Sequence, residues 1–460
     1  MSENSYKDIF TEYDKSIFSD GSIDPMGLRI IWTSLGNKIF KNKLNTISND
    51  IRYYTLNLFH HYVICQCEVQ FEDKIINLIS RPPYNNRHDL HDGIIIFLES
   101  LLAHAAVKGN IEDDQNSNSS VLATYKLKGL MYNKPNDKRV NYLFVDRKEG
   151  ILVRHILLGI HGRYKGPFQQ IGIFYKNNYY QNTKFWKEEA PFLFANAPWN
   201  TLANDLIKII DSKILSAKNY SATPIKIRVN DILSKGITNK YMQALKSANF
   251  KEKKFINFWE KQLGLMEGAA YLLYRELIDA EDKDNYELII KKSSNKGSTD
   301  DNKYLTAICK IEPFITCIDK AINRLLKRGT IQIDNELKKF MSKWLNSKII
   351  NLSAINLYMN NTYLSQEALL RLKKLLEIYY ASKDKNDPVL FIHKIIAFHK
   401  DIMDGRGNTA WISIGTNNSI TQHSSFNYSE DYLKFLESYE WVNSYYLPTV
   451  KNLYEGLYNQ

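Results

Sequence analysis

Cysteine is scarce in this chain of 460 residues, which contains only four. That number is too small for the framework of disulfide bonds on which many secreted domains depend. We therefore expect a protein of the reducing cytoplasm. The four thiols are those of Cys65, Cys67, Cys309 and Cys317.

Long apolar runs are also missing. A membrane-spanning helix needs about 18 to 20 mainly apolar residues, and the best candidate, residues 93–107, contains Glu99 and His104. The first 14 residues lack the basic start and apolar centre of an export signal. The sequence therefore predicts no membrane partner.

The standard motifs of nucleotide and cofactor chemistry are absent as well. The sequence has no glycine-rich phosphate loop, no dinucleotide fingerprint, no metalloprotease helix motif and no serine elbow. We therefore expect no cofactor, and a non-enzymatic role is favoured over catalysis.

Positive charge, in contrast, is in excess, with a formal net charge of +11. Such a balance attracts phosphate backbones, so DNA is the expected partner. A second interpretation stays open. Lys, Asn, Ile, Tyr and Phe all have AT-rich codons, and an AT-rich genome would supply the basic and aromatic excess without selection for nucleic acid.

Apolar residues recur mainly at the helical spacing of three and four residues. Residues 255–277 predict one long amphipathic helix, and residues 304–325 predict another that Pro313 kinks or divides. Ser365 is a candidate N-cap for a third helix. Short strands are predicted at residues 140–146, 225–229 and 411–414.

The predicted fold is therefore mainly α, a multi-domain helical protein with a few short β-hairpin or wing elements. Polar, turn-rich segments at residues 110–120 and 291–302 mark the expected boundaries. They define an N-terminal helical domain over residues 1–115, a central α+β region over 116–290 and a C-terminal helical domain over 303–460.

One short segment concentrates groups that could carry chemistry. It runs from Arg87 to Gly93 and contains His88, Asp89, His91 and Asp92, with His60 and His61 upstream. With those two histidines or His399 added by the fold, the cluster would form a divalent-metal hydrolase site. The favoured alternative is structural, because Asp89 or Asp92 would cap the apolar helix that follows. We predict no bound metal.

The segment from Arg154 to Lys176 is the strongest candidate for nucleic-acid binding. It predicts a helix over residues 151–160, a turn at Gly162 and an apolar packing run, as in a helix-turn-helix with a wing. The alternative is an ordinary helical hairpin with a basic corner. The candidate DNA-contacting residues are Arg154, Arg163, Lys165, Gln169 and Gln170.

A second polar group lies near the end of a predicted helix at residues 391–411. The helix is expected to end near Gly405 or Gly407, since glycine readily adopts the left-handed conformation that closes a helix. The group is either a site of interaction with a partner or a set of helix caps. Its members are His399, Lys400, Asp404, Arg406 and Asn408.

A pattern of residues near the start of the sequence is shared with other proteins. It consists of Asp24, Pro25, Met26, Gly27, Leu28, Trp32, Gly36, Thr46, Asn49, Asp50, Ile51, Arg52 and Tyr53. In this pattern, which covers about thirty residues, the chain resembles a family of uncharacterised bacterial proteins found among anti-phage defence genes. The resemblance implies no catalytic residue. It implies a bacterial protein that works beside a helicase, a nuclease or an ATPase.

Together these features favour a non-enzymatic, DNA-associated or scaffolding subunit of a defence complex. The alternative is a metal-dependent nuclease that uses the segment from His88 to Asp92. A third possibility is a purely structural scaffold whose basic surface reflects composition alone.

Overall fold

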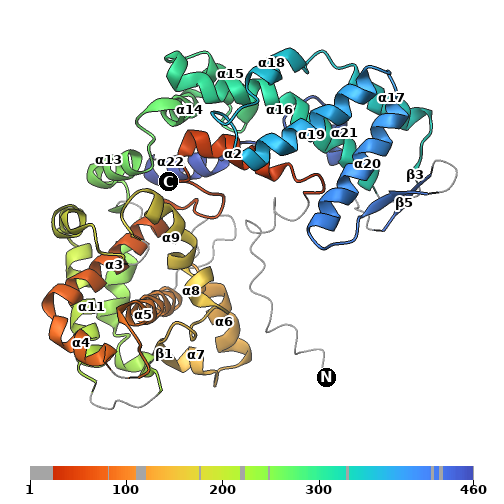
Figure 1. Cartoon of the computed structure of the whole chain (residues 1–460). Coiled ribbons are helices and arrows are strands. Elements are labelled where there is room, and N and C mark those ends of the chain that lie inside the picture. Colours follow the sequence, from red (N-terminus) through yellow and green to blue (C-terminus); the bar gives the residue numbers. More distant parts are fainter. Residues whose placement is uncertain are drawn as a thin grey trace. The chain divides into compact units, whose positions relative to one another are not determined.

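The computed structural model describes residues 24–80, 82–109, 121–175, 178–217, 223–246, 249–327, 331–415, 419–423 and 428–458. These residues form two compact units. Unit 1 contains residues 43–263 and 452–458, and unit 2 contains residues 24–42 and 264–451. Helices dominate each unit (Figure 1), which confirms the predicted mainly-α class.

The core of unit 1 is α5 (Arg87–Lys108), in which every residue from Leu90 to Ala106 is buried. A helix that is apolar on all sides belongs inside a protein or a membrane. Among the described residues, α5 is the one helix long and apolar enough to cross a membrane, but 94% of its apolar window is buried within the structure. It is therefore the core helix of unit 1.

Other elements of unit 1 cover α5 on several sides. Among those that pack against it are α3, α6, α8, α12 and the strand β1. The remaining bounds in unit 1 are α3 (Ile51–Gln70), α4 (Glu72–Ile79), α6 (Thr124–Asn133), α7 (Lys138–Asn141), α8 (His155–Leu158), α9 (Ile160–Gln170), the π-helix η2 (Phe185–Glu189), α10 (Ala190–Leu193), α11 (Trp199–Ile209), the π-helix η3 (Ile210–Leu215), the 3-10 helix η4 (Val229–Asp231), α12 (Lys235–Ala244) and α13 (Lys253–Gln262).

A two-stranded antiparallel ribbon lies against α5. It consists of β1 (Tyr142–Val145) and β2 (Ile225–Arg228), with Tyr142 opposite Arg228 and Val145 opposite Ile225. Both strands fall within the predicted segments 140–146 and 225–229, so these two predictions are confirmed.

The core of unit 2 is α16 (Thr299–Leu326), against which α2, α14, α15, α17, α18 and α21 pack. The helix runs unbroken through Pro313, so this proline does not divide it. The other bounds are α2 (Arg29–Phe40), α14 (Gly268–Asp279), α15 (Tyr286–Ser294), α17 (Asn335–Leu345), α18 (Leu352–Leu357), α19 (Gln366–Lys383), α20 (Pro388–Gly405), α21 (Glu430–Glu437) and α22 (Leu447–Tyr458), which crosses the division at residue 451.

Unit 2 also contains a small antiparallel sheet with the strand order β3–β5–β4. Its strands are β3 (Ile331–Gln332), β4 (Ile412–Ile414) and β5 (Ser419–Gln422). The strand predicted at residues 411–414 is therefore confirmed. The predicted cap at Ser365 is confirmed too, because its hydroxyl accepts a hydrogen bond from the backbone N–H of Ala368 at 3.3 Å.

The single helix predicted over residues 255–277 is wrong. The structure has two helices there, α13 and α14, separated by a turn. Gly264 in this turn and Gly268 at the start of α14 have φ angles of +73° and +62°. Glycine adopts this left-handed conformation without steric cost and commonly ends a helix. Apolar residues keep the helical spacing across the turn, which is why the periodicity did not reveal it.

The domain division also differs from the three consecutive domains expected. Residues 264–290 belong to unit 2, because α14 packs on α15 and α16. The boundary therefore lies at residue 263 and not at the polar segment 291–302. The other expected boundary, 110–120, lies outside the described residues.

Candidate active site

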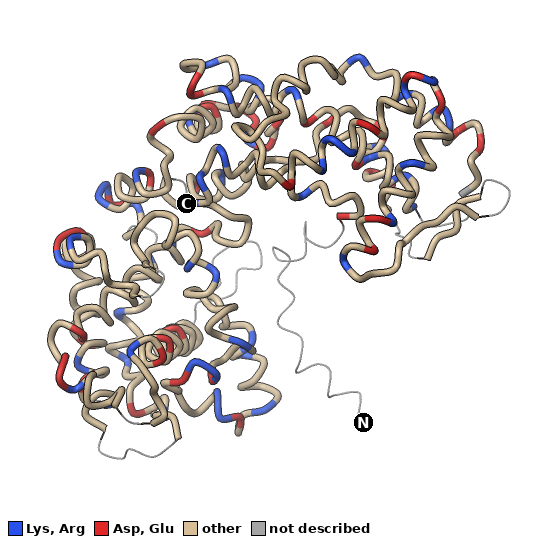
Figure 2. Tube along the Cα trace, viewed as in Figure 1, with Lys and Arg blue, Asp and Glu red and all other residues tan. Residues whose placement is uncertain are grey.

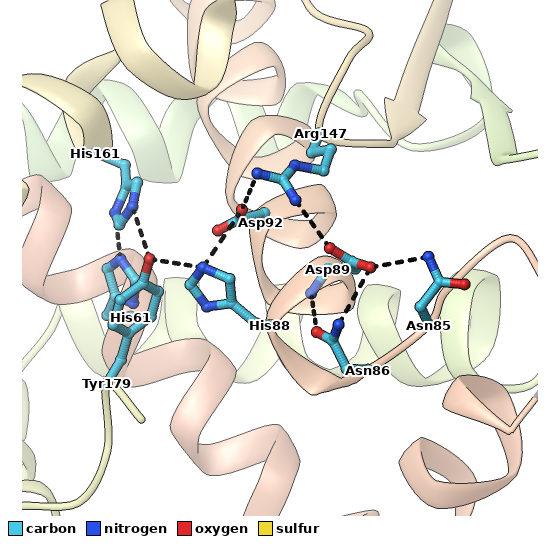
Figure 3. A network of polar contacts seen from close by, with 9 residues as sticks. All are labelled: His61, Asn85, Asn86, His88, Asp89, Asp92, Arg147, His161 and Tyr179. Atoms are coloured by element: carbon cyan, nitrogen blue, oxygen red, sulfur yellow. Dashed lines mark hydrogen bonds and ion pairs between the residues drawn. The ribbon is translucent and has the colours of Figure 1, made fainter. Parts of the chain in front are cut away.

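The first turn of α5 places the residues of the Arg87–Gly93 segment around one end of the core helix. Asn86 is the N-cap, and its side-chain oxygen accepts from the backbone N–H of Asp89 at 2.9 Å. The capping role considered for Asp89 and Asp92 therefore falls to Asn86. Both carboxylates are left for other contacts (Figure 3).

Arg147, which follows β1, contacts both carboxylates. Its Nη1 lies 3.0 Å from Oδ1 of Asp89, and its Nη2 lies 3.9 Å from Oδ2 of Asp92. Gly93 permits this approach, because a Cβ at that position would stand 2.9 Å from the carbonyl carbon of Val145. Gly93, the last residue of the Arg87–Gly93 segment, thus allows the end of β1 to pack against α5.

We expect Gly93→Ala to lower the free energy of unfolding by about 1 to 3 kcal/mol, because the added methyl group overpacks this contact. Gly129→Ala on α6 is the matched control, since its Cβ would meet nothing within 4 Å. The control should be neutral or raise stability by about 0.5 to 1 kcal/mol. Urea unfolding measures both, and equal stabilities for the two variants would contradict the close approach.

A connected series of rings extends inward from His88, and we call it the His–Tyr network. Nε2 of His88 lies 3.4 Å from the hydroxyl of Tyr179, which lies 3.4 Å from Nε2 of His161. Nδ1 of His161 lies 2.9 Å from Nε2 of His61, and Nδ1 of His61 lies 2.9 Å from the hydroxyl of Tyr180. Figure 3 shows how His61, His88, His161 and Tyr179 meet.

His88 is the solvent-facing end of this network. Its side chain is 39% exposed, whereas that of Asp92, whose Oδ2 lies 3.8 Å from Nε2 of His88, is 4% exposed. Burial raises the pKa of Asp92 and lowers the pKa of His88. Deeper in the network, burial lowers the pKa of His161 to about 4 and that of His61 well below its usual value. The inner imidazoles are therefore neutral at pH 7.

Glu99 fixes the position of His161 from the middle of α5. Its Oε1 accepts from the backbone N–H of His161 at 2.7 Å, and its Oε2 accepts from that of Ile160 at 2.9 Å. A carboxylate here satisfies the unpaired N–H groups at the start of α9. Burial alone would raise the pKa of Glu99, but the contact with His155 and the N–H of His161 lower it.

His91 lies one helical turn after His88 on α5. Its Nε2 lies 3.0 Å from Oε1 of Glu68, which also contacts Arg87 at 3.2 Å. The ring of His91 packs against that of Tyr180, with centroids 5.3 Å apart. These groups support the inner end of the His–Tyr network, whereas His88 and Asp92 form its outer end.

The structure thus unites His61, His88 and Asp92, as the metal-site hypothesis required, but not the other two histidines. Nε2 of His60 lies 3.5 Å from the hydroxyl of Tyr241, and His399 belongs to unit 2. In the described part of the chain, no group of three or more His, Cys, Asp or Glu is arranged to hold a metal ion. The ring nitrogens of His61 face His161 and Tyr180 instead.

The predicted helix-turn-helix does not form between residues 151 and 170. Arg154 has a left-handed φ of 55° before the four-residue α8, and Gly162 lies inside α9 and not in a turn. Nε of Arg163 donates to the carbonyl of Leu158 at 3.0 Å. Gln169 and Gln170 lie in the last turn of α9, half-buried and exposed respectively. The segment is a helical corner.

Lys165 from that segment belongs to the candidate site instead. Its Nζ lies 5.1 Å from the centroid of the Tyr179 ring, a cation–π distance. Its charge contributes to lowering the pKa values of His88, His61 and His161, after the larger effect of burial. Lys165 and Arg147 are thus the two cations at the outer end of the network.

The polar group predicted near the end of α20 has mainly a structural role. The ring of His399 contacts the carbonyl of Pro25 and the backbone N–H of Trp411, each at 2.9 Å. Nη1 of Arg406 donates to the carbonyl of Asp24 at 2.7 Å. These two side chains attach the residues before α2 to α20. Asp404 and Asn408 are exposed.

No protein-family model, curated protein or solved structure matches the chain. Sequence reasoning missed Glu99, Arg147, His161, Tyr179 and Tyr180. The one available signal was the unusual presence of an acid, Glu99, within an apolar helix.

Proposed function

We propose that unit 1 carries a metal-independent general acid–base site that cleaves phosphodiester bonds in nucleic acid. The observation that supports this most strongly is the half-exposed imidazole of His88, held between a buried carboxylate and a tyrosine beside two cations. A histidine that is merely exposed at a surface is usually surrounded by water, whereas His88 contacts the buried side chains of Asp92 and Tyr179. Perturbed titratable groups that converge in this way are common at catalytic sites.

His88 would act as the general base. Its lowered pKa keeps the imidazole neutral at pH 7, the form that accepts a proton. Among the described residues, its polar contacts all involve Nε2, which leaves Nδ1 for the attacking hydroxyl. The imidazolium formed by this transfer is stabilised by Asp92, 3.8 Å from Nε2. As the attacking oxygen bonds to phosphorus, the bond from phosphorus to the leaving oxygen breaks, and the imidazolium of His88 returns the proton to that oxygen.

Lys165 and Arg147 would bind the phosphate and neutralise the charge that develops on it during attack. Arg147 suits a phosphate because its guanidinium presents several N–H donors in one plane. The net charge of +11 supports a polyanionic substrate over a small neutral one. The proposal therefore keeps the nuclease function of the alternative hypothesis but does not require a metal ion. DNA stays a proposed partner.

The resemblance at residues 24–53 supports a place beside a helicase, nuclease or ATPase in a bacterial defence system. That context and a cytoplasmic location are also part of the proposal. A cleaving subunit and a DNA-associated subunit of such a complex are compatible roles.

The test is cleavage of end-labelled single-stranded and duplex DNA and RNA by the purified chain in EDTA. We expect cleavage by the wild-type protein and a loss of about 10²- to 10⁴-fold for His88→Ala and for Asp92→Asn. Exposed His423 in unit 2 supplies the matched control, and His423→Ala should cleave as the wild type does.

Two results would contradict the proposal. Cleavage that requires a divalent metal and is abolished by EDTA would restore the metal-dependent nuclease. Tight binding of nucleic acid with no cleavage of any substrate would restore the non-enzymatic subunit. The pH profile adds a check, because activity should rise through a pKa below the ordinary histidine value and then level off.

A further inference from the structure

α6 exposes two aromatic rings that the core of unit 1 does not use. Tyr125 is 72% exposed and Tyr132 is 89% exposed. They are seven residues apart, which is close to two helical turns, so both lie on one face of α6. The opposite face carries Leu127, which packs in a buried cluster with Ala103 of α5.

The surface between the two rings is open. Gly129 lies four residues after Tyr125 and three before Tyr132, so it shares their face. A Cβ at Gly129 would meet no heavy atom within 4 Å. The two tyrosines therefore flank an uncovered stretch of helix, with no side chain of the described residues filling the space beside Gly129.

The segment around these rings is strongly basic. Residues 124–141 contain five cations and one carboxylate, Asp137. Arg139 pairs with Asp137 at 2.8 Å, and Lys138 pairs with Glu149. The others lie near the tyrosines in sequence, and Figure 2 shows Lys and Arg positions along α6 and α7. They are Lys126, Lys128 and Lys134.

We infer that this face of α6 binds a single strand of nucleic acid, with bases stacked on Tyr125 and Tyr132 and lysines beside the phosphates. Exposed aromatic rings interleaved with cations are how proteins hold single strands without reading sequence. A duplex does not fit this surface, because its bases are already stacked on one another. Charge complementarity favours a polyanion over an apolar protein partner.

The inference rests on the proposed function in one respect, namely that nucleic acid is the substrate. α6 packs on the C-terminal half of α5, whose first turn carries His88. Ala103 is 15 residues after His88, a distance of about 22 Å along a helix axis. A strand bound at α6 would thus be retained within one unit while another part of it reaches His88.

The experiment is fluorescence anisotropy with labelled oligo(dT), oligo(U) and a duplex of matched length. We expect the wild-type chain to prefer both single strands over the duplex. Tyr125→Ala with Tyr132→Ala should weaken single-strand binding by about tenfold or more, whereas Tyr→Phe at both positions should retain it. Phe192→Ala, which removes an exposed ring on α10 that is 66% exposed, is the matched control.

Several results would overturn the inference. These are absence of single-strand binding by the wild-type chain, equal binding of the duplex, or binding that survives the double alanine change. A difference between oligo(dT) and oligo(U) would identify which single strand is preferred. Lys126→Ala with Lys128→Ala should flatten the dependence of binding on salt, because fewer counterions are released.

The same measurements separate this inference from the proposed function. His88→Ala should bind single strands as the wild type does while losing cleavage. Strong binding that depends on the two tyrosines, with no cleavage by any variant, would remove the catalytic proposal and leave the binding face in place. Cleavage that depends on His88 but not on the tyrosines, even for long strands, would remove the binding face and leave the catalytic proposal in place.

Discussion

Acidification from about pH 7 to about pH 5 is expected to destabilise unit 1 and to stabilise unit 2. The buried groups with strongly shifted pKa values differ in kind between the two units. His399 in unit 2, whose pKa burial lowers, and Asp92 in unit 1, whose pKa burial raises, oppose the two effects with smaller shifts. Burial lowers the pKa values of His60, His104 and His161 in unit 1 to about 4. In unit 2, burial raises the pKa values of Glu312 and Asp319 to about 7.

The sign for unit 1 follows from where protons bind. Below pH 6.5 the histidines of the unfolded chain take up protons, whereas the buried native rings stay neutral until about pH 4. Stability that is complete above pH 6.5 is therefore lost as the pH falls. At pH 5 each of the three histidines costs about 2 kcal/mol, for a sum of about 6 kcal/mol. That is comparable with the whole stability of many domains.

The sign for unit 2 is the reverse. Glu312 and Asp319 stay protonated in the native state up to about pH 7, whereas in the unfolded chain they ionise near pH 4. The native state thus binds more protons between these values, and its stability falls as the pH rises. Lys320, whose pKa burial lowers to about 8, changes its charge only above this range.

Amide hydrogen exchange, resolved by peptides from α5 and α16 and corrected for intrinsic rates, measures both effects at once. Protection of α5 should fall on acidification while protection of α16 rises. His104→Gln removes one titrating group and retains a donor for the carbonyl of Arg139, which Nε2 of His104 contacts at 3.1 Å. This variant should reduce the number of protons that unit 1 takes up on unfolding by about one. Parallel changes in both helices would contradict the prediction.

Replacing Glu312 with alanine is expected to lower the free energy of unfolding of unit 2 by about 3 to 5 kcal/mol. This carboxyl group is fully buried, and in its ionised form it accepts four hydrogen bonds. Its Oε2 accepts from Nε1 of Trp32 at 2.8 Å and from the hydroxyl of Tyr445 at 2.6 Å. Its Oε1 accepts from the hydroxyl of Thr316 at 3.0 Å and the backbone N–H of Asn443 at 3.2 Å.

The large cost arises because those donors come from three separate parts of unit 2. Trp32 lies on α2, Thr316 lies on α16, and Asn443 and Tyr445 lie shortly before α22. Alanine would leave all four donors buried without an acceptor, which costs more than the bonds themselves contribute. The loss would also detach α2 and the C-terminal segment from α16.

Unfolding in urea, followed by amide hydrogen exchange in peptides from unit 2, tests this expectation. Glu312→Gln keeps the size of the side chain and one acceptor oxygen, so it should lower the free energy of unfolding by less than alanine does. Because glutamine does not titrate, the contribution of this position to the pH dependence of stability should vanish. Exposed Lys310 on the same helix gives the control, and Lys310→Ala should change stability by less than about 0.5 kcal/mol. An alanine variant as stable as this control would show that the four contacts contribute nothing.

The sequence correctly predicted the elements whose signal is local. Aromatic and β-branched residues marked β1, and alternation marked β2. Helical spacing marked α16 and α19, and Ser365 marked a helix start, because each pattern depends on neighbours a few residues apart. The break between α13 and α14 escaped detection because the apolar spacing continued through it. The helix-turn-helix was misplaced because Gly162 resembled a turn residue but lies within α9.

By itself, then, the sequence determined the helical class and one half of the candidate site. The residues from Arg87 to Gly93 form that half, because the first turns of a helix are set by adjacent residues, although the N-cap is Asn86 and not Asp89 or Asp92. Only the tertiary structure determined the other half. His161 reaches His61 across 100 residues, and Tyr180 reaches it across 119. Glu99 positions His161 by accepting from the first N–H groups of α9, and Gly93 admits the end of β1 and so brings Arg147 to the site. Neither role has a signature in the spacing of residues along the chain.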